Sequence, residues 1–133
     1  MNYILDTNVF IHIMKNKTPN LLKKISQQRG ASFYLSSITE AELWYGVANS
    51  KQRTKNGELL SKLLSYFVKL PFNSVDAEKY GSIKFEQMKS GKVIGPYDLL
   101  IATQAIELDA ILITANEKEF KQIRNLKVEN WLK

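Results

Sequence analysis

The chain has 133 residues, of which 44% are apolar, so it is long enough for a single domain over residues 1–133 with a sizeable core. It has no cysteine and one histidine, which excludes disulfides, thiolate metal sites and a multi-histidine zinc site within one chain. Its formal net charge is +6, from 19 Lys and Arg against 13 Asp and Glu, which favours polyanionic partners such as nucleic acid. We see no signal peptide and no apolar run of the ~20 residues that a membrane span needs, so we expect a soluble cytoplasmic protein.

The first informative stretch is Tyr3–Asn8, where three apolar residues are followed at once by a carboxylate. This pattern predicts a short buried strand over Tyr3–Leu5 with Asp6 at its carboxyl end, followed by an amphipathic helix. Ligands and chemistry collect at the carboxyl ends of strands in open α/β sheets. Asp6 is therefore the first candidate site residue.

The next elements follow from turn residues and apolar spacing. In chain order we expect a helix from Thr18-Pro19 to Arg29-Gly30, a strand over Phe33–Leu35, a helix beginning near Thr39, and one long helix over Lys51–Leu70 whose inner face carries Leu59, Leu60, Leu63, Leu64 and Phe67. The aromatic residues Phe10, Trp44 and Tyr45 are expected in the core or in an interface rather than as platforms for stacking nucleotides.

Two capping boxes compete at the start of the helix near Thr39. One pairs Ser37 with Glu40, and the other pairs Thr39 with Glu42. The second also offers a hydrophobic staple between its flanking apolar residues, so we expect Thr39 to be the cap. This gives Glu42 a structural role of its own.

The second informative stretch begins at Gly95-Pro96, after a helix expected over Asp76–Met88. Proline suits the first turn of a helix, which places Asp98 in that turn. Ala102 and Ala105 follow Asp98 at i+4 and i+7, so the carboxylate heads a small apolar face that points inward. A carboxylate that merely stabilises the helix dipole fits the same pattern.

The end of the chain completes a mainly parallel sheet. Ala110–Thr114 is apolar without alternation, which is typical of a parallel strand buried on both faces. A short helix is expected over Glu117–Phe120, and Val128–Trp131 is expected to add an edge strand. Asn116 either caps the short helix or lies at the carboxyl edge of the sheet near Asp6. Strands alternating with helices predict a three-layer α/β/α domain.

Acidic groups brought together inside a fold repel one another unless a cation neutralises them. Carboxylate oxygens are hard ligands that favour Mg²⁺ or Mn²⁺. Such an ion activates water and stabilises the leaving oxygen in phosphodiester hydrolysis. Since the chain has no Gly-rich phosphate loop, no serine nucleophile motif and no cysteine, metal-assisted hydrolysis is the chemistry that best matches its residues.

Four segments of the chain also occur in the order and at the spacing of a known family. They are Ile4-Leu5-Asp6-Thr7-Asn8-Val9; Ser36-Ser37-Ile38-Thr39 leading to Glu42-Leu43 and Gly46; Gly95-Pro96-Tyr97-Asp98 leading to Ile101-Ala102; and Leu112-Ile113-Thr114-Ala115-Asn116 leading to Phe120. Together they resemble a PIN-domain ribonuclease of the VapC toxin type over nearly the whole chain. The Gly-Pro-Tyr-Asp segment resembles the enteric branch that cleaves initiator tRNA in the anticodon region.

This resemblance implies a Mg²⁺- or Mn²⁺-dependent endoribonuclease of a toxin–antitoxin pair, with RNA, and tRNA in particular, as substrate. Asp6 and Asp98 would be the principal metal ligands, and Glu42 would complete the acidic cluster directly or through water. Many relatives carry a fourth acid where this chain has Asn116. This departure leaves open whether the site holds one metal ion or two. Glu119 would partly substitute for that acid or lie on the surface as an ordinary side chain.

The resemblance further implies a homodimer and a VapB-type antitoxin whose C-terminal segment covers the active-site groove. A second hypothesis remains beside the nuclease: a non-catalytic PIN-like module that binds RNA or a protein. The amide of Asn116 in place of an acid motivates this alternative.

Overall fold

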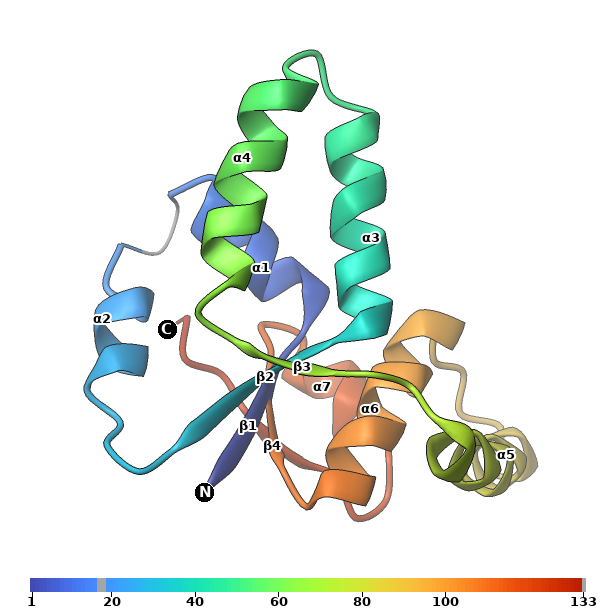
Figure 1. Cartoon of the computed structure of the whole chain (residues 1–133). Helices are drawn as coiled ribbons and strands as arrows, with labels where there is room; N and C mark the ends of the chain where they lie inside the picture. The colour runs from blue at the N-terminus through green and yellow to red at the C-terminus, as the bar shows by residue number, and fades with distance from the viewer. Residues whose placement is uncertain (17–18, 133) are drawn as a thin grey trace.

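The computed structural model describes residues 1–16 and 19–132 and shows a central sheet with helices on both faces (Figure 1). Its elements are β1 (Asn2–Leu5), α1 (Thr7–Met14), α2 (Leu21–Ser26), β2 (Ser32–Ser36), α3 (Ser37–Ala48), α4 (Arg53–Leu64), β3 (Val68–Leu70), α5 (Ser74–Lys89), α6 (Pro96–Leu108), β4 (Ile111–Ile113), α7 (Glu117–Phe120) and β5 (Lys127–Glu129). Within the described ranges, no helix is both long and apolar enough to cross a membrane.

The five strands form one sheet in the order β3-β2-β1-β4-β5, and every neighbouring pair is parallel. This confirms the expected parallel sheet. In its middle, Leu5 of β1 pairs with Ile113 of β4. Because all the strands point the same way, their carboxyl ends meet along one edge, where the chain continues into Asp6 and Thr114.

Alternation along the central strands divides the core into two layers, as the three-layer prediction required. Leu5 and Ile113 lie in a core with the buried faces of α1, α2, α3 and α4. Ile4 and Leu112 lie on the opposite side of the sheet, in a core with α6 and α7 and with partly buried residues of α5. Figure 1 shows these two groups of helices on either side of the sheet.

The buried strands were predicted well because an unbroken apolar run has few alternatives. Phe33–Leu35 lies inside β2, and Ile111–Ile113 lies inside the predicted Ala110–Thr114. The C-terminal edge strand is also present but begins one residue earlier than expected and ends at Glu129. The expected cap of the second helix at Thr18 lies outside the described residues, and that helix begins at Leu21.

The prediction of one long helix over Lys51–Leu70 is wrong. The helix ends at Leu64, and Val68–Leu70 forms the edge strand β3, which pairs with β2. Apolar residues at helical spacing continue up to Phe67. The next residues are nevertheless extended, because only an extended segment can form hydrogen bonds with the free backbone groups along the edge of β2. Leu59, expected on the inner face, is half exposed, whereas Leu60 is fully buried.

The predicted cap of α3 is also wrong. Ser36 is the N-cap, and its Oγ accepts a hydrogen bond of 3.0 Å from the backbone N–H of Ile38. Strand β2 pairs with β3 as far as Ser36, so the chain must turn there and the helix starts earlier than Thr39. Glu42 is therefore not the partner in a capping box.

A buried polar network fixes the start of α3 against α6 and β3. Ser36 Oγ donates to Gln104 Oε1, and Gln104 Nε2 donates to the carbonyl of Leu70 at 3.1 Å. Ser36 and Gln104 are both shielded from solvent, so water cannot replace these bonds. The network connects the helix that carries Glu42 to the helix that carries Asp98.

We expect Gln104→Met to lower the free energy of unfolding by about 2 kcal/mol, because the change keeps the volume but leaves Ser36 and the Leu70 carbonyl without a buried partner. Gln87→Met is the matched control. Gln87 is also buried, but its Nε2 has no hydrogen-bond partner among the described residues. Urea unfolding should show a change within about 0.5 kcal/mol for the control. Equal losses in both variants would contradict the proposed importance of the network.

Candidate active site

Asp6 lies at the carboxyl end of β1, where its backbone N–H continues the sheet by donating to Ile113 O at 3.1 Å. Its side chain is only 4% exposed. Oδ1 accepts a 3.0 Å bond from the backbone N–H of Val9 and thereby caps α1, and Oδ2 accepts from Thr114 Oγ1. Burial raises the pKa of Asp6, and these two hydrogen bonds oppose the rise only in part.

Thr114 is a site residue that the sequence reasoning did not single out. Its hydroxyl donates to Asp6 and accepts a 2.9 Å bond from the backbone N–H of Asn116, which aims the proton at the carboxylate. The available signal was its place directly after β4. That place becomes informative only once β1 and β4 are known to be neighbours in register.

Glu42 reaches the same region from α3. Its carboxylate accepts a 2.7 Å bond from Thr7 Oγ1, and that hydroxyl lies 3.2 Å from Thr39 Oγ1. Thr39, the predicted cap, is instead buried against α1. Thr7 follows Asp6 directly, so these contacts hold α3 beside the start of α1 and point Glu42 towards the end of β1.

Asp98 lies in the first turn of α6, as predicted from Gly95-Pro96. Ala102 and Ala105 on the same face are fully buried, which confirms the close packing of that face. The pKa of Asp98 is raised to about 6, first by burial and then by the negative charges of Glu119, Asp6 and Glu42.

The four carboxylates of Asp6, Glu42, Asp98 and Glu119, which we call the acidic cluster, therefore act on one another electrostatically. The ion pairs found among the described residues involve other acids, namely Glu40, Glu117 and Asp109. His12 lowers the pKa of Asp6 through its charge, but this effect is smaller than that of burial. A concentration of negative charge without paired Lys or Arg is the environment that a divalent cation stabilises.

Asn116 and Glu119 form a unit at the start of α7. Asn116 Nδ2 donates to Glu119 Oε2 at 2.6 Å, so its side chain does not make the capping bond that was one of its two predicted roles. Glu119 exerts the largest charge effect on Asp98. Of these two residues, the glutamate is thus the one that adds charge to the site.

An open cleft of about 740 Å³, which we call the acidic cleft, brings the three principal acids together. It is lined by Asp6, Thr7, Asn8, Ile11, Ile38, Ala41, Glu42, Tyr45, Gly46, Tyr97 and Asp98. No Lys or Arg is among these described lining residues, although the chain as a whole carries a net positive charge. Asn116 and Glu119 lie outside this lining.

A second hollow of about 550 Å³, the apolar groove, runs between α1, α3 and α4 and adjoins the acidic cleft. Its lining comprises Ile11, Ile13, Met14, Lys15, Glu42, Leu43, Gly46, Val47, Asn56, Leu59 and Leu63. The two hollows share Ile11, Glu42 and Gly46. The exposed Leu59 is one wall of this groove, which accounts for its failure to join the core.

The chemistry of these side chains fits a hard cation. Among the described residues, no three acid or histidine side chains are close enough to form a complete set of metal ligands. Mg²⁺ does not require such a set, because it is usually held by one or two carboxylates and keeps several waters. The uncompensated charge around Asp98 and the oxygen-only donors of the cleft are compatible with that mode of binding.

Comparison with known proteins gives the family. The family model described as PIN domain matches residues 3–126. The ribonuclease VapC2 of Rickettsia felis is 40% identical over 135 residues, and the tRNA(fMet)-specific endonuclease VapC of Shigella flexneri is 30% identical over 131 residues. Each alignment covers 98% of this chain and 98% of the relative.

A solved structure agrees with these alignments. The chain matches one in the VapBC2 complex of Rickettsia felis, bound to a DNA fragment from its promoter, with a TM-score of 0.94 and 36% identity. The match covers 98% of this chain and 99% of that one. The fold is thus that of the PIN-domain class. Within that class, the chain belongs to the VapC ribonuclease family.

Asp98→Asn should stabilise the folded chain at pH 8 by about 1 kcal/mol, since solvent screening reduces the ~3 kcal/mol that a pKa shift from 3.8 to about 6 represents. The folded state binds the proton more tightly than the unfolded state, so the stability of the natural chain falls as the pH rises from 4 to 6. The advantage of the variant should therefore disappear below pH 4. Thermal unfolding across this pH range measures it.

Asp109→Asn serves as the control for this prediction. Asp109 is exposed, and Lys127 lowers its pKa by a hydrogen bond and by its charge. Its backbone φ is 55°, a left-handed conformation that Asn tolerates well. This variant should show no gain in stability at pH 8. A gain equal to that of Asp98→Asn would contradict the electrostatic interpretation of the site.

Proposed function

We propose that this VapC-family ribonuclease is a Mg²⁺- or Mn²⁺-dependent endoribonuclease, in which Asp6, Glu42 and Asp98 form the catalytic site within one functional unit of residues 1–133. The observation that carries the proposal is the acidic cleft, whose lining brings together Asp6, Glu42 and Asp98 from distant parts of the sequence. The raised pKa of Asp98, caused first by burial and then by the charges of Glu119, Asp6 and Glu42, agrees with this grouping.

In this proposal Asp6 and Asp98 hold the ion, and Glu42 acts directly or through water. When bound, the divalent ion supplies an activated water and stabilises the negative charge on the leaving oxygen. Thr114 keeps Asp6 oriented, and Thr7 does the same for Glu42. Glu119 adds negative charge near Asp98, and Asn116 positions Glu119 through its amide.

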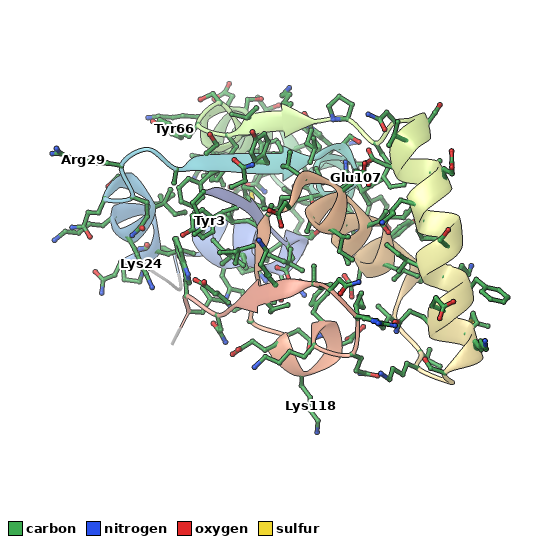
Figure 2. The ribbon with its side chains drawn as sticks, turned by 90° about the horizontal axis from the view of Figure 1, so that it is seen from below. Tyr3, Lys24, Arg29, Tyr66, Glu107 and Lys118 are labelled. Carbon is green, nitrogen blue, oxygen red and sulfur yellow. The ribbon has the colours of Figure 1, made fainter. Side chains whose placement is uncertain are left out.

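The proposed substrate is RNA, and tRNA in particular. The name of the Shigella flexneri relative supports this target, with the initiator tRNA as its specific form. Basic side chains such as Arg29 and Lys118 extend from separate edges of the molecule (Figure 2). We infer that such residues contact the RNA backbone outside the acidic cleft, so binding should weaken as the salt concentration rises.

We also propose that the chain forms a homodimer and belongs to a toxin–antitoxin pair with a VapB-type antitoxin. The VapBC2 complex supports the second part, since its matching chain shares the fold over nearly its full length. The exposed apolar residues Phe85 and Met88 of α5 are three positions apart on the helix and suit contact with a second copy.

Cleavage of RNA by the purified chain tests the catalytic proposal. We expect activity with Mg²⁺ or Mn²⁺, loss of activity with EDTA, and a loss of at least about 100-fold in Asp6→Asn. Asn is the informative replacement because its side-chain oxygen can still accept from the Val9 N–H. Asp6→Ala should also be inactive, but removal of the cap additionally costs about 1 kcal/mol of stability.

Asp109→Asn should cleave RNA like the natural chain, because Asp109 is exposed and lies at the other end of α6. The metal-dependent mechanism would be ruled out if the natural chain cleaved RNA equally well with Mg²⁺ and with EDTA, and if Asp6→Asn cleaved it at the same rate. RNA binding without cleavage under saturating Mn²⁺ would instead support the non-catalytic PIN-like module. The uncharged amide of Asn116 in place of an acid motivates that second candidate.

A further inference from the structure

Two aromatic side chains lie at the acidic cleft in an unusual way. Tyr45 of α3 is 70% exposed, and Tyr97 of α6 is 57% exposed, yet both line the cleft together with Asp6, Glu42 and Asp98. The sequence interpretation placed Tyr45 in the core or in an interface, as is correct for the fully buried Phe10. In the folded chain Tyr45 contributes little to the core, so its position calls for another explanation.

Each tyrosine is placed by its helix next to an acid. Tyr45 follows Glu42 by three positions and Ala41 by four, so these residues share the face of α3 that borders the cleft. Tyr97 directly precedes Asp98 in the first turn of α6. Helices α3 and α6 contact each other, and Figure 1 shows α6 beginning near the base of α3. The rings therefore stand on two helices that meet at the acids.

The cleft presents an electrostatic difficulty for an RNA substrate. Its acidic residues repel phosphate, and none of the described lining residues is a Lys or Arg that would attract it. Binding inside the cleft must therefore come from a bound cation and from contacts that do not depend on charge. Stacking of bases on aromatic rings is such a contact, and single-stranded RNA offers unpaired bases for it.

Gly46 leaves open space at the cleft beside Tyr45. It lies inside α3, where glycine costs about 1 kcal/mol relative to alanine. A Cβ atom at this position would meet no atom within 4 Å, so the packing of the protein does not require glycine. Gly46 lines the cleft beside Tyr45, and its missing side chain leaves the helix backbone open next to the ring.

We propose that Tyr45 and Tyr97 form a stacking clamp that holds two unpaired bases of single-stranded RNA on either side of the phosphate to be cleaved. This assignment rests on the proposed nuclease function and adds positioning residues to it. The clamp holds the RNA by its bases, so the acidic cluster does not have to attract the backbone. It also confines cleavage to loops and other unpaired segments, because bases in a duplex cannot reach the rings.

The test measures the affinity of a fluorescein-labelled single-stranded RNA by anisotropy, in the Asp6→Asn background so that no cleavage occurs. Tyr45→Leu and Tyr97→Leu should each weaken binding by about 5- to 10-fold, in line with the value of base stacking on an aromatic residue. The slope of log affinity against log salt should stay unchanged, because no ionic contact is removed. Phe at either position should restore affinity to within about twofold, since it keeps the ring.

Tyr66→Leu is the matched control, because Tyr66 is 69% exposed, lies after α4 (Figure 2) and is not among the residues that line the cleft. It should bind RNA like the unmodified background. A Leu variant that binds normally, or a Phe variant as weak as Leu, would overturn the clamp. So would a loss of affinity at only one tyrosine. Normal RNA binding combined with lost affinity for a VapB-type partner would assign the rings to protein docking instead.

Gly46→Ala gives a second test that does not alter an aromatic residue. It should raise thermal stability, as should Gly81→Ala in α5, where a Cβ also meets nothing within 4 Å. Only Gly46→Ala should weaken RNA binding, and equal binding by both variants would count against the clamp. Failure of the nuclease proposal is recognised separately, as absent cleavage by the natural chain with Mn²⁺, whereas these binding measurements need no turnover.

Discussion

The pairing of β1 with β4 is the constraint on which the site depends. Because Leu5 and Ile113 are partners in a parallel register, the next residue of each strand, Asp6 and Thr114, emerges at the same level of the sheet. Asp6 then ends the strand, caps α1 through the Val9 N–H, and accepts the hydroxyl of Thr114. The carboxylate of Asp6 thus fixes the direction of α1 and is itself held in place at the end of β1. Glu42 and Asp98 line the same cleft.

The composition of the cleft shows how charge is divided over this molecule. A net charge of +6 attracts polyanions from a distance, whereas the described lining of the cleft is acidic, apolar and aromatic. Burial of Asp98 and its repulsion by Glu119, Asp6 and Glu42 lower the stability of the folded state as the pH rises from 4 to 6. Sites that bind cations carry this cost before the ion arrives, and the buried cores on both faces of the sheet maintain the fold against it.

Sequence reasoning succeeded where a local pattern has few alternatives. The buried runs at β1 and β4 and the Gly-Pro start of α6 were located correctly, and so were the two aspartates that follow from them. It failed where distant pairing decides the structure. A capping box at Thr39 looked favourable, but pairing of β2 with β3 up to Ser36 moved the start of α3. The strand character of Val68–Leu70 likewise depends on a neighbour more than 30 positions away.

The convergence of the acids could not be derived from spacing alone, because it depends on strand order and helix placement. The family resemblance supplied that information for Asp6, Glu42 and Asp98. It did not indicate Thr7 and Thr114, whose hydroxyls hold two of these acids, since threonine near a strand end is common. The exposed tyrosines were missed for another reason: aromatic residues are usually buried, and only the folded chain shows that these two border a hollow.

The wall shared by the acidic cleft and the apolar groove has a thermodynamic consequence. Ile11, Glu42 and Gly46 belong to both hollows, so a molecule seated in one alters the free volume and the side-chain freedom of the other. Binding in the two hollows is therefore coupled, and such coupling is reciprocal. A molecule in the groove changes the affinity of the cleft for nucleic acid, and nucleic acid in the cleft changes the affinity of the groove for that molecule by the same factor. A molecule bound in the apolar groove would thus contact Glu42 without entering the space in which the proposed metal ion binds.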